Sequence, residues 1–579
     1  MNYKLLLLGF LSLGFARISA QTFPLQVKDE KLTYVTDERG NRILDYSSCG
    51  YHNSEQPIPD VANAVFVSWQ PGDNSSRIQR AIDYVSSLAL DKNGFRGAVL
   101  LDKGTFELNE SLRISVSGVV LRGSDREQTV LLKKGVDRGA LLYIEGRNDL
   151  AVTDTLDVLT SYVPVNTCTF QVTNNVQLVS GERVRIVRPS TKEWIASVGC
   201  DIFGGGISAL GWKEGEMDLV WDRSVSKADG NQLTLDAPLT MALDNKWGTV
   251  KVLRYSWPGR IAEAGLENLT LASDYNKKYP KDEDHCWTGV SIENAENCWV
   301  RRVNFKHFAG SAVIIQRTGS KTTVEDCVST EPVSEIGGMR RSTFYTMGQQ
   351  TLFQRCYSEE GYRDFTVGVA VPGPNAFVQC HSERPYSFSG STGGFSNGIL
   401  MDKITVSGGI IQLGYRDMAD QGAGWVAANS MCWQGRASQT HCVTPPTAHN
   451  WAYGMWTQPF GNGHYELSHT FVKPESFFYA QLAARMDKSS MEEKKIFVYT
   501  TDETTKPTPE YAHWMSVQSL KPDMRMDVWI DSMIVKYPLE ITQNNAPLLN
   551  EVNWRPRKRE ACGHGRTFTS RKMAGLCGE

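Results

Sequence analysis

The apolar positions after residue 95 fall into short runs with turns between them. Each run covers three to five residues and ends at a glycine or a polar position. Short runs of this kind, bounded by turn residues, predict β-strands. The runs are Gly97–Leu101, Gly104–Leu108, Leu112–Ile114, Val119–Gly123 and Thr129–Leu132.

One segment before these runs has a helical period. Its apolar side chains lie at Ile78, Ala81, Ile82 and Val85, which form one stripe of a helix. The preceding Asp73–Ser76 supplies side-chain oxygens that can cap the helix N-terminus. We therefore expect a capped helix, followed by the short strands.

The middle of the chain repeats a five-residue strand pattern. The copies are Arg301–Phe305, Glu325–Ser329, Gln354–Ser358 and Val378–Ser382. The last three carry cysteines, Cys327, Cys356 and Cys380, which are 29 and 24 residues apart. This spacing suits one coil of a solenoid, and strand alternation turns the cysteines inward, one above the next. Because a free cysteine packs as a small hydrophobe, we interpret the column as a core ladder and not as a metal site.

A second strand precedes each of these copies, and long irregular segments connect successive coils. The second strands are Gly289–Ile292, Ala312–Ile315, Thr366–Val369 and Gly398–Met401. The long connections are 273–286, 330–341 and 383–394. Loops that leave one edge of a solenoid shape its binding groove, so we expect functional residues there.

The remaining segments are less regular. Residues 150–260, which include Gly204–Gly206, are expected to continue the coils with a large loop insertion. Phe477–Arg485 is expected to be a helix and Met526–Lys536 a strand. The basic tail from Arg555 is expected to be a cap or a tether. The expected division is 1–20 signal peptide, 21–54 N-terminal extension, 55–445 parallel β-helix and 446–579 C-terminal β-rich cap and tail.

The N-terminus and the composition bear on location and partners. Lys4, the apolar stretch 5–15 and the small residues up to Ala20 are typical of a cleaved signal peptide, so we expect a secreted or periplasmic protein without membrane insertion. The net charge of −3 argues against a nucleic-acid partner, which would require a basic face. We expect a monomer. The twelve cysteines allow disulfides, and the preferred pairs are Cys432–Cys442 and Cys562–Cys577.

The helix, the strands and the repeats together, over about residues 55–440, resemble the pectate-lyase-like superfamily. Three later segments, Gly424–Asn429, Pro445–Ala452 and Ser476–Leu482, resemble a bacterial subgroup associated with polysaccharide degradation. The resemblance implies an all-β chain folded as a right-handed parallel β-helix, with an N-terminal capping helix and an irregular C-terminal β-rich cap. It implies less about the reaction, because this solenoid hosts lyases, hydrolases, esterases and adhesins.

The chain departs from that subgroup at three places where histidines are usual. Arg363 stands at the first, Thr392–Phe395 replaces a His-His-Arg-Trp run, and Ala423 stands at the third. The site is therefore either re-specialised or lost.

Arginine and tyrosine in the presumed groove favour elimination next to a uronic acid carboxylate. That reaction needs a cation for the carboxylate, a base for the C5 proton and an acid for the leaving oxygen. We expect Arg363 to be catalytic and partly exposed, near Arg341, His285 or Arg416, with Tyr362 as proton carrier and Asp364 orienting it. His285 is a further candidate base. The candidate substrate-binding residues are Arg340, Arg341, Arg416, Lys306, His307 and Trp425.

No metal site is assigned, although the acidic run 282–284 could hold Ca²⁺ or be an ordinary solvated loop. The expected function is an exported lyase that forms unsaturated uronyl products from an acidic polysaccharide or oligosaccharide. Two alternatives stay open. One is a glycoside hydrolase with a carboxylate pair drawn from Asp326, Glu359, Glu383 and Asp364. The other is a non-catalytic glycan-binding module.

Overall fold

The computed structural model describes residues 25–28, 31–173, 177–203, 210–470, 472–487, 494–497, 508–519, 524–539, 541, 546–552 and 554. The expected signal peptide, the Gly204–Gly206 run, the Cys562–Cys577 pair and the basic tail lie outside these residues. Among the described helices, none has the length and apolarity that crossing a bilayer would require.

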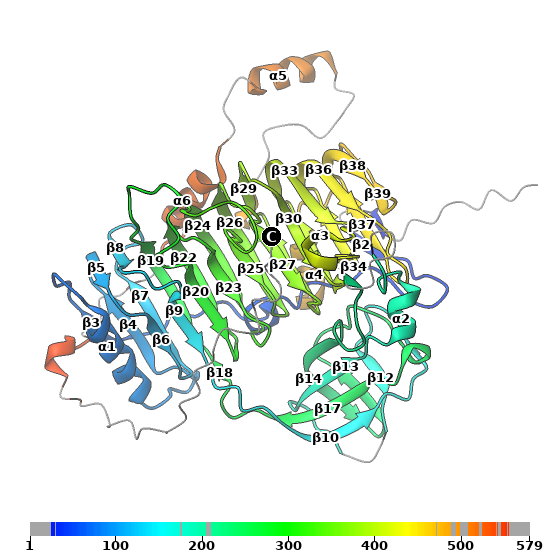
Figure 1. The fold of residues 1–579 in the computed structure, drawn as a ribbon, viewed down its shortest axis with the longest axis horizontal. Coiled ribbons are helices and arrows are strands. Elements are labelled where there is room, and N and C mark those ends of the chain that lie inside the picture. The colour runs from blue at the N-terminus through cyan, green and yellow to red at the C-terminus, as the bar shows by residue number, and fades with distance from the viewer. Residues whose placement is uncertain are drawn as a thin grey trace, which may run out of the picture.

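The main body is a right-handed parallel β-helix with three faces (Figure 1). Face A consists of β3 (Asn63–Val67), β4 (Gly97–Leu101), β7 (Val119–Gly123), the first halves of β19 (Gly265–Ser273), β22 (Trp299–Lys306), β24 (Thr323–Thr330) and β26 (Thr351–Glu359), then β28 (Asn375–Val378), β32 (Ile399–Asp402), β35 (Ser430–Trp433), β37 (Asn450–Tyr453) and β39 (His464–Glu466).

The other two faces follow the same coils. Face B consists of β5 (Gly104–Leu108), β8 (Thr129–Lys133), the second halves of β19, β22, β24 and β26, then β29 (His381–Glu383) and the first halves of β33 (Thr405–Leu413), β36 (Arg436–Cys442) and β38 (Trp456–Phe460). Face C consists of β6 (Leu112–Ile114), β9 (Ala140–Glu145), β20 (Thr288–Glu293), β23 (Ser311–Ile315), β25 (Phe344–Thr346), β27 (Phe365–Val369) and β30 (Phe388–Gly393), then the second halves of β33, β36 and β38. The short strands β18 (Ile261–Ala262), β21 (Ala295–Glu296), β31 (Ser396–Asn397) and β34 (Ala427–Ala428) form the C–A corner.

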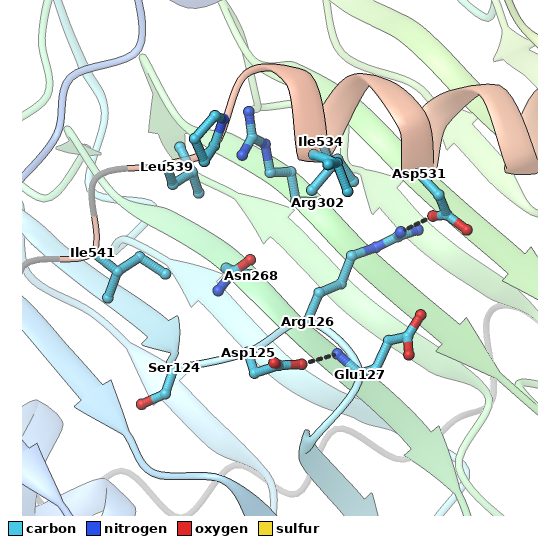
Figure 2. A pocket seen from close by; sticks show the side chains of 12 residues that line it. Ser124, Asp125, Arg126, Glu127, Asn268, Arg302, Asp531, Ile534, Leu539 and Ile541 are labelled. Carbon is cyan, nitrogen blue, oxygen red and sulfur yellow. Dashed lines mark hydrogen bonds and ion pairs between the residues drawn. The ribbon is translucent and has the colours of Figure 1, made fainter.

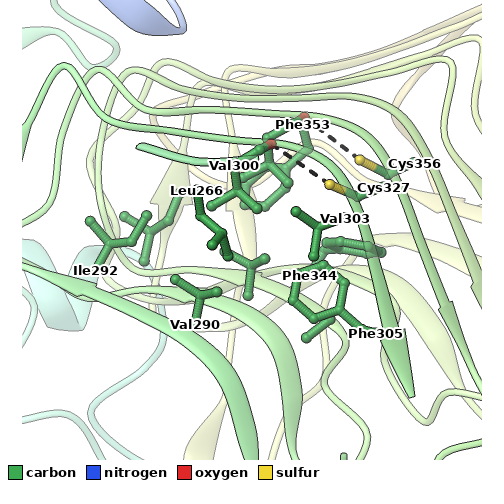
Figure 3. Packing of buried hydrophobic residues seen from close by; sticks show 14 of the residues in the cluster. Leu266, Val290, Ile292, Val300, Val303, Phe305, Cys327, Phe344, Phe353 and Cys356 are labelled. Atoms are coloured by element: carbon green, nitrogen blue, oxygen red, sulfur yellow. Dashed lines mark hydrogen bonds between the residues drawn. The ribbon is translucent and has the colours of Figure 1, made fainter. Parts of the chain in front are cut away.

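The interior is apolar, and the cysteine ladder is confirmed. Figure 3 shows Cys327 and Cys356 beside Val300, Phe344 and Phe353 in the core. Cys327 and Cys356 are in register on adjacent coils, and both are free and buried. The expected Cys432–Cys442 disulfide is wrong, because both thiols are free and pack in the same core.

A polar ridge marks the A–B bend of the coils. Each of seven successive coils places a non-glycine residue there in the left-handed region, with φ between 48° and 60°. Their side chains point outward and are nevertheless buried, because the C-terminal strap (described residues between 472 and 541) crosses them. The seven are Asn268, Arg302, Asp326, Arg355, Gln379, Lys403 and Gln434.

The strap contains α4 (Phe477–Met486) and α6 (Met526–Lys536), whereas α5 (Pro509–Ser519), which lies between them in sequence, projects away from the solenoid (Figure 1). α4 is confirmed, whereas the expected strand at Met526–Lys536 is wrong. Trp529 and Ile530 of that segment pack on Tyr357 of face B together with Met533 and Ile534. Contacts at three- and four-residue spacing require a helix.

The N-terminal part closes one end and covers one face. α1 (Ser75–Ser87) is confirmed and buries Ile78, Ala81, Ile82 and Val85 in the solenoid core. A hairpin of β1 (Leu25–Lys28) and β2 (Lys31–Tyr34) precedes a segment that packs on the outside of face A, where Tyr46 and Leu44 meet Leu400. η1 (Tyr51–Ser54) continues along face A, and η5 (Leu549–Glu551) lies beside β3.

Residues 146–260 form a separate small domain, so the expectation of continuing coils is wrong. Its antiparallel sheet has the order β10 (Ala151–Asp157), β17 (Lys251–Ser256), β13 (Arg183–Arg188), β14 (Leu219–Asp229), β15 (Gln232–Leu235) and β12 (Thr169–Gln171). It also contains β11 (Tyr162–Val163), β16 (Leu243–Asp244), α2 (Lys192–Ser197) and η3 (Asn245–Trp247). Trp194 and Trp221 lie in its core, which also contacts Phe395 and Ala428 of the solenoid.

The solenoid also continues past the expected boundary at residue 445. β37, β38 and β39 pair in parallel with the preceding coil. Pro445 lies in the loop between β36 and β37, so it interrupts a strand pattern without ending the helix.

Candidate functional site

Among the described residues, the N-terminal segment and the helix α6 pack on faces A and B, respectively, and not on face C. Face C has the B–C loops along one border and the small domain along the other (Figure 1). The loop after β33 carries the one-turn α3 (Ala419–Gly422), which lies in front of β30.

Two arginines share one carboxylate at the B–C border of face C. Nη2 of Arg363, just before β27, lies 2.8 Å from Oδ2 of Asp420. Nη1 of Arg416 lies 2.6 Å from the same oxygen. Both guanidinium groups lie over the ring of Phe388, at 4.9 and 4.7 Å from its centroid. We call Arg363, Arg416, Asp420 and Phe388 the arginine cluster. Within it, two cations share one anion.

Asp420 stands on a strained and half-exposed turn. Asp420 and Gln421 have φ of 47° and 65°, a conformation that costs a non-glycine residue roughly 1–3 kcal/mol. The Asp420 side chain is 42% exposed. Burial opposes its ionisation, but hydrogen bonds and charge from Arg416 and Arg363 outweigh burial, so the pKa of Asp420 lies below its ordinary value. An incoming carboxylate could replace such a group.

The floor beside the cluster holds buried polar atoms. Tyr345, Thr366 and Gln412 belong to neighbouring strands of face C, and Gly390 lies in register between the last two. Among the described residues, the Thr366 hydroxyl and the Gln412 side-chain carbonyl oxygen have no hydrogen-bond partner. Buried polar atoms of this kind call for an explanation, and a bound ligand is one.

Tyr345 lies in the same floor. Burial raises the pKa of its phenol, although the charges of Arg317 and Arg363 oppose this. The phenol fits because residue 368 is glycine: a Cβ there would lie 2.7 Å from the Tyr345 oxygen. The phenol therefore stays protonated at neutral pH and can donate a proton.

The expectation that Arg363 is partly exposed is wrong. It is 4% exposed, because the α3 turn, which comes from two coils later, covers it with Asp420. Tyr362 is half-buried, and its ring centroid lies 5.1 Å from the Arg363 guanidinium. The structure does bring Arg363 together with Arg416, which share Asp420.

Asp364 does not orient Arg363, so that expectation is wrong. Its carboxylate lies inside the B–C corner and accepts hydrogen bonds from the hydroxyls of Thr343, Ser358 and Ser382. Burial raises the pKa of Asp364, and the three hydrogen bonds oppose that shift. The alternation of the strand breaks at this corner, which places Asp364 and Phe365 inside together.

His285 is also misassigned as a base. It is fully buried, and its Nδ1 lies 2.8 Å from the Ser273 hydroxyl oxygen. Its Nε2 donates to the carbonyl oxygens of Val333 and Asp282, at 3.0 and 3.1 Å. His285 thereby ties two B–C loops together and has no free nitrogen for substrate.

The other predicted binding residues lie around the cluster. Arg340 pairs with Glu283, and Arg341 donates to the carbonyl oxygens of Ser334 and Glu360, so both brace the B–C loops. Trp425 donates to the carbonyl oxygen of Val198 at 2.8 Å and thus joins the α3 loop to the small domain.

Lys306 and His307 lie elsewhere. Lys306 is in register with Ala272 and Thr330 on face B. Nε2 of His307 lies 3.4 Å from the carboxylate of Glu331. Neither residue joins the arginine cluster, because their strand ends on face B before the loop begins.

The carboxylates considered for hydrolysis are not on face C. Asp326 lies under the strap, 2.6 Å from Nε of Arg355. Glu359 and Glu383 project from face B, where Glu359 pairs with Arg384 and Glu383 with His381 at 3.1 Å. Together with the interior position of Asp364, these contacts separate all four from the face C floor.

A different carboxylate pair, Glu145 and Glu293, lies on face C in register on adjacent strands. Glu145 is ion-paired with Arg113, whereas the Glu293 carboxylate has no partner among the described residues. Burial and the neighbouring Glu145 raise the pKa of Glu293. The sequence signal was present, since each glutamate ends an apolar run and is followed by a turn residue, Gly146 or Asn294.

The Asp282 and Asp284 carboxylates of the acidic loop 282–284 already have hydrogen-bond or ion-pair partners within the protein. Asp282 accepts from the backbone N–H groups of Asn276 and Asp284, and Asp284 pairs with Arg138 at 2.7 Å. Within the part of the chain that the structure describes, no group of three or more His, Cys, Asp or Glu side chains is arranged to hold a metal ion.

A cavity of about 330 Å³ lies away from face C, between α6 and the A–B bend (Figure 2). Figure 2 shows Arg126 paired with Asp531 of α6, and Ile534 and Leu539 on the strap side. Arg302 donates to the backbone carbonyl of Tyr537. These polar groups hold the strap, so we do not take this cavity as the functional site.

Comparison with known families and curated proteins gives one match. The family described as "Domain of unknown function (DUF6298)" matches residues 463–569, which comprise β39, the strap and the tail. No curated protein matches the chain.

Solved β-helix structures are similar to the chain at low identity. The tailspike protein gp49 from Pseudomonas phage LKA1 is 11% identical with a TM-score of 0.35, over 66% of this chain and 56% of that one. The polygalacturonase from Erwinia carotovora ssp. carotovora is 10% identical with a TM-score of 0.31, over 71% and 96%. PfbA, a surface adhesin of Streptococcus pneumoniae, is 8% identical with a TM-score of 0.31, over 73% and 90%. The chain thus spans little more than half of the tailspike. At these scores the similarities assign no activity.

Proposed function

We propose that this protein is an exported enzyme that binds an acidic polysaccharide along face C and cleaves it by β-elimination. The observation that carries the proposal is the arginine cluster, where two arginines share a carboxylate on a strained, half-exposed turn. Asp420 stands in for a uronate carboxylate. The guanidinium fork matches a carboxylate in geometry as well as in charge.

The chemistry follows from the groups around that carboxylate. Once the uronate replaces Asp420, Arg363 and Arg416 neutralise it, which makes the C5 proton more acidic. Tyr362, beside Arg363, accepts the C5 proton as its phenolate, and the electron pair of the C5–H bond forms the C4–C5 double bond. The C4–O bond breaks, its electron pair leaves with the oxygen, and the Tyr345 phenol donates its proton to that oxygen. Proton exchange with solvent then restores the Tyr362 phenolate and the Tyr345 phenol. The products are an unsaturated uronyl end and a free hydroxyl.

A second reaction, glycoside hydrolysis, is favoured by Glu145 and Glu293. Their surroundings differ: Glu145 is ion-paired with Arg113, whereas burial and the neighbouring Glu145 raise the pKa of Glu293. Such a pair supplies a base or nucleophile and an acid. Strands stack about 4.8 Å apart, and retaining glycosidases hold their carboxyl groups about 5–5.5 Å apart.

Product analysis separates the two reactions. The full chain is incubated with pectin, alginate, ulvan and glycosaminoglycan fragments. Elimination gives products with the ultraviolet absorbance of an unsaturated uronyl group, which Arg363→Gln should abolish and Glu293→Gln should leave intact. Reducing ends without that absorbance, lost in Glu293→Gln, would replace the lyase assignment with hydrolysis.

A further inference from the structure

The root of the small domain, where the chain leaves and re-enters the solenoid, holds a second group of arginines that the proposed reaction does not use. Arg183, Arg185 and Arg260 lie there with two carboxylates, Asp222 and Glu296. Three cations therefore face two anions. Arg183 pairs with Glu296 of the C–A corner, and Nη1 of Arg260 lies 3.0 Å from Oδ2 of Asp222.

Arg185 has the most distant ion-pair partner of the three arginines. It is in register with Asp222 across β13 and β14, but its Nε lies 4.0 Å from that carboxylate. Asp222 is already engaged, because it accepts from the Tyr255 hydroxyl at 2.6 Å and from Arg260. The buried Nε of Arg185 has no hydrogen-bond partner among the described residues.

Two aromatic rings hold the Arg185 guanidinium in place. Its Cζ lies 5.4 Å from the ring centroid of Tyr255 and 5.3 Å from that of Trp257. The side chain is 23% exposed. An arginine stacked on aromatic rings is pre-organised, so it loses little conformational entropy when its fork binds an oxyanion.

This place adjoins face C. Trp257 donates to the carbonyl oxygen of Arg147 at 2.8 Å, two residues after Glu145. The side-chain amide of Asn294, the residue after Glu293, donates to the carbonyl oxygen of Gly146 at 3.2 Å. The network also reaches the next two coils, because Arg260 donates to the Ser320 hydroxyl after β23 and the Asp222 N–H donates to the Gln349 side chain after β25 at 2.9 Å. The Arg185 group thus lies along the C–A corner of the coils that contain β20, β23 and β25. From these coils to β27 are one to three strand steps, or about 5–14 Å along the solenoid.

We propose that Arg185 is a second carboxylate-binding subsite, which holds a uronate of the same chain whose other uronate lies on Arg363 and Arg416. The inference rests on the proposed function for the identity of the ligand. It adds that the substrate is an oligomer long enough to span from the cluster to the small domain, and that the small domain is part of the binding site.

The test is titration of uronate oligosaccharides of increasing length into the full chain, followed by calorimetry. Arg185→Gln should bind the shortest oligomers as the wild type does and lose roughly tenfold or more in affinity for long ones, as expected for one charge-assisted contact. Arg185→Lys should recover only part of the loss, because lysine keeps the charge but not the fork. Arg254→Gln is the matched control, since Arg254 is in register with the core residue Val184 and pairs with Glu182 on the other side of the sheet.

The outcomes separate the two claims. If Arg363→Gln weakens binding of every oligomer and Arg185→Gln weakens none, the subsite is overturned and the proposed function stands. Equal losses in Arg185→Gln and Arg254→Gln would also overturn it, because the effect would then be a general one on the sheet. If no uronate oligomer binds the wild type, the proposed function fails and the subsite with it.

Discussion

At the scale of single residues, the arginine cluster depends on what Asp420 does. Its carboxylate satisfies two arginines that would otherwise be buried cations, yet it stands on a turn whose backbone is strained. A stand-in carboxylate of this kind stabilises the free protein and competes with substrate. The same residue therefore affects stability and affinity in opposite directions.

Asp420→Asn should tighten binding of acidic oligosaccharides, because the arginines no longer have an internal anion. If they are open for about a tenth of the time in the wild type, the gain is roughly tenfold. The unfolding temperature should fall at the same time. Calorimetry and thermal unfolding of Asp420→Asn measure both, and Asp417→Asn, on the same loop, is the control. An unchanged or weaker affinity would show that Asp420 does not occupy the substrate position.

At the scale of elements, the C-terminal strap contributes to the fold as well as the coils do. It lies over the polar A–B ridge and supplies partners for it: Gln379 donates to the Lys495 carbonyl at 3.1 Å, and the Lys403 ammonium lies 2.9 Å from Glu475. The described residues of the matched family region 463–569 thus include the segments that cover this ridge.

Substitution of Arg355 tests how much the polar ridge beneath the strap contributes to stability. It is fully buried, with Nε 2.6 Å from Asp326 and Nη2 3.1 Å from Glu325. Arg355→Ala leaves two buried carboxylates without their cation, which should destabilise the protein by about 3–5 kcal/mol. Denaturant unfolding measures this loss. Arg384→Ala, an exposed arginine on the next coil, should change stability by less than about 1 kcal/mol. Similar losses in the two variants would contradict the role given to the ridge.

Asp402 makes the docking of α4 sensitive to pH. It is fully buried and accepts from the Phe478 N–H at 2.9 Å and from the Ser476 hydroxyl, while its Oδ1 has no partner among the described residues. Burial raises the pKa of Asp402 to about 6, although these hydrogen bonds oppose the shift. The unfolded carboxyl titrates near 3.9.

Because the folded pKa is the higher one, the stabilising protonation is complete below about pH 4 and is lost as the pH rises through about 6. The α4 amides should therefore exchange with solvent more slowly at about pH 5 than at about pH 7.5, after correction for the intrinsic rates. Asp402→Asn should remove most of that difference. Equal protection at both pH values in the wild type would contradict the shift.

At the scale of the whole molecule, the solenoid was predictable and the site only in part. The repeats at Cys327, Cys356 and Cys380 define the coils because each coil obeys the same inward–outward alternation. The small domain was missed because its strands are as short and mixed as those of the coils, and only their antiparallel pairing distinguishes them.

Contacts between distant segments also explain why the sequence predicted the site only in part. Arg363 and Arg416 are brought together by a turn from two coils later, and no local pattern reveals that Asp420 covers them. Asp364 and His285 were misplaced because the B–C corner breaks the strand alternation and because loop residues can be buried. Arg185 belongs to a small domain whose fold had to be known before its position beside the solenoid could be seen.

The most direct test of the account is the affinity of the full chain for a long uronate oligosaccharide, compared with a neutral oligosaccharide of equal length, in the wild type and in the double variant Arg363→Gln/Arg416→Gln. The account predicts that the wild type prefers the acidic ligand. It also predicts that the double variant loses that preference by more than about 100-fold, because two charge-assisted contacts are removed. Equal affinity of the wild type for both ligands, or an acidic preference that survives in a folded double variant, would contradict it.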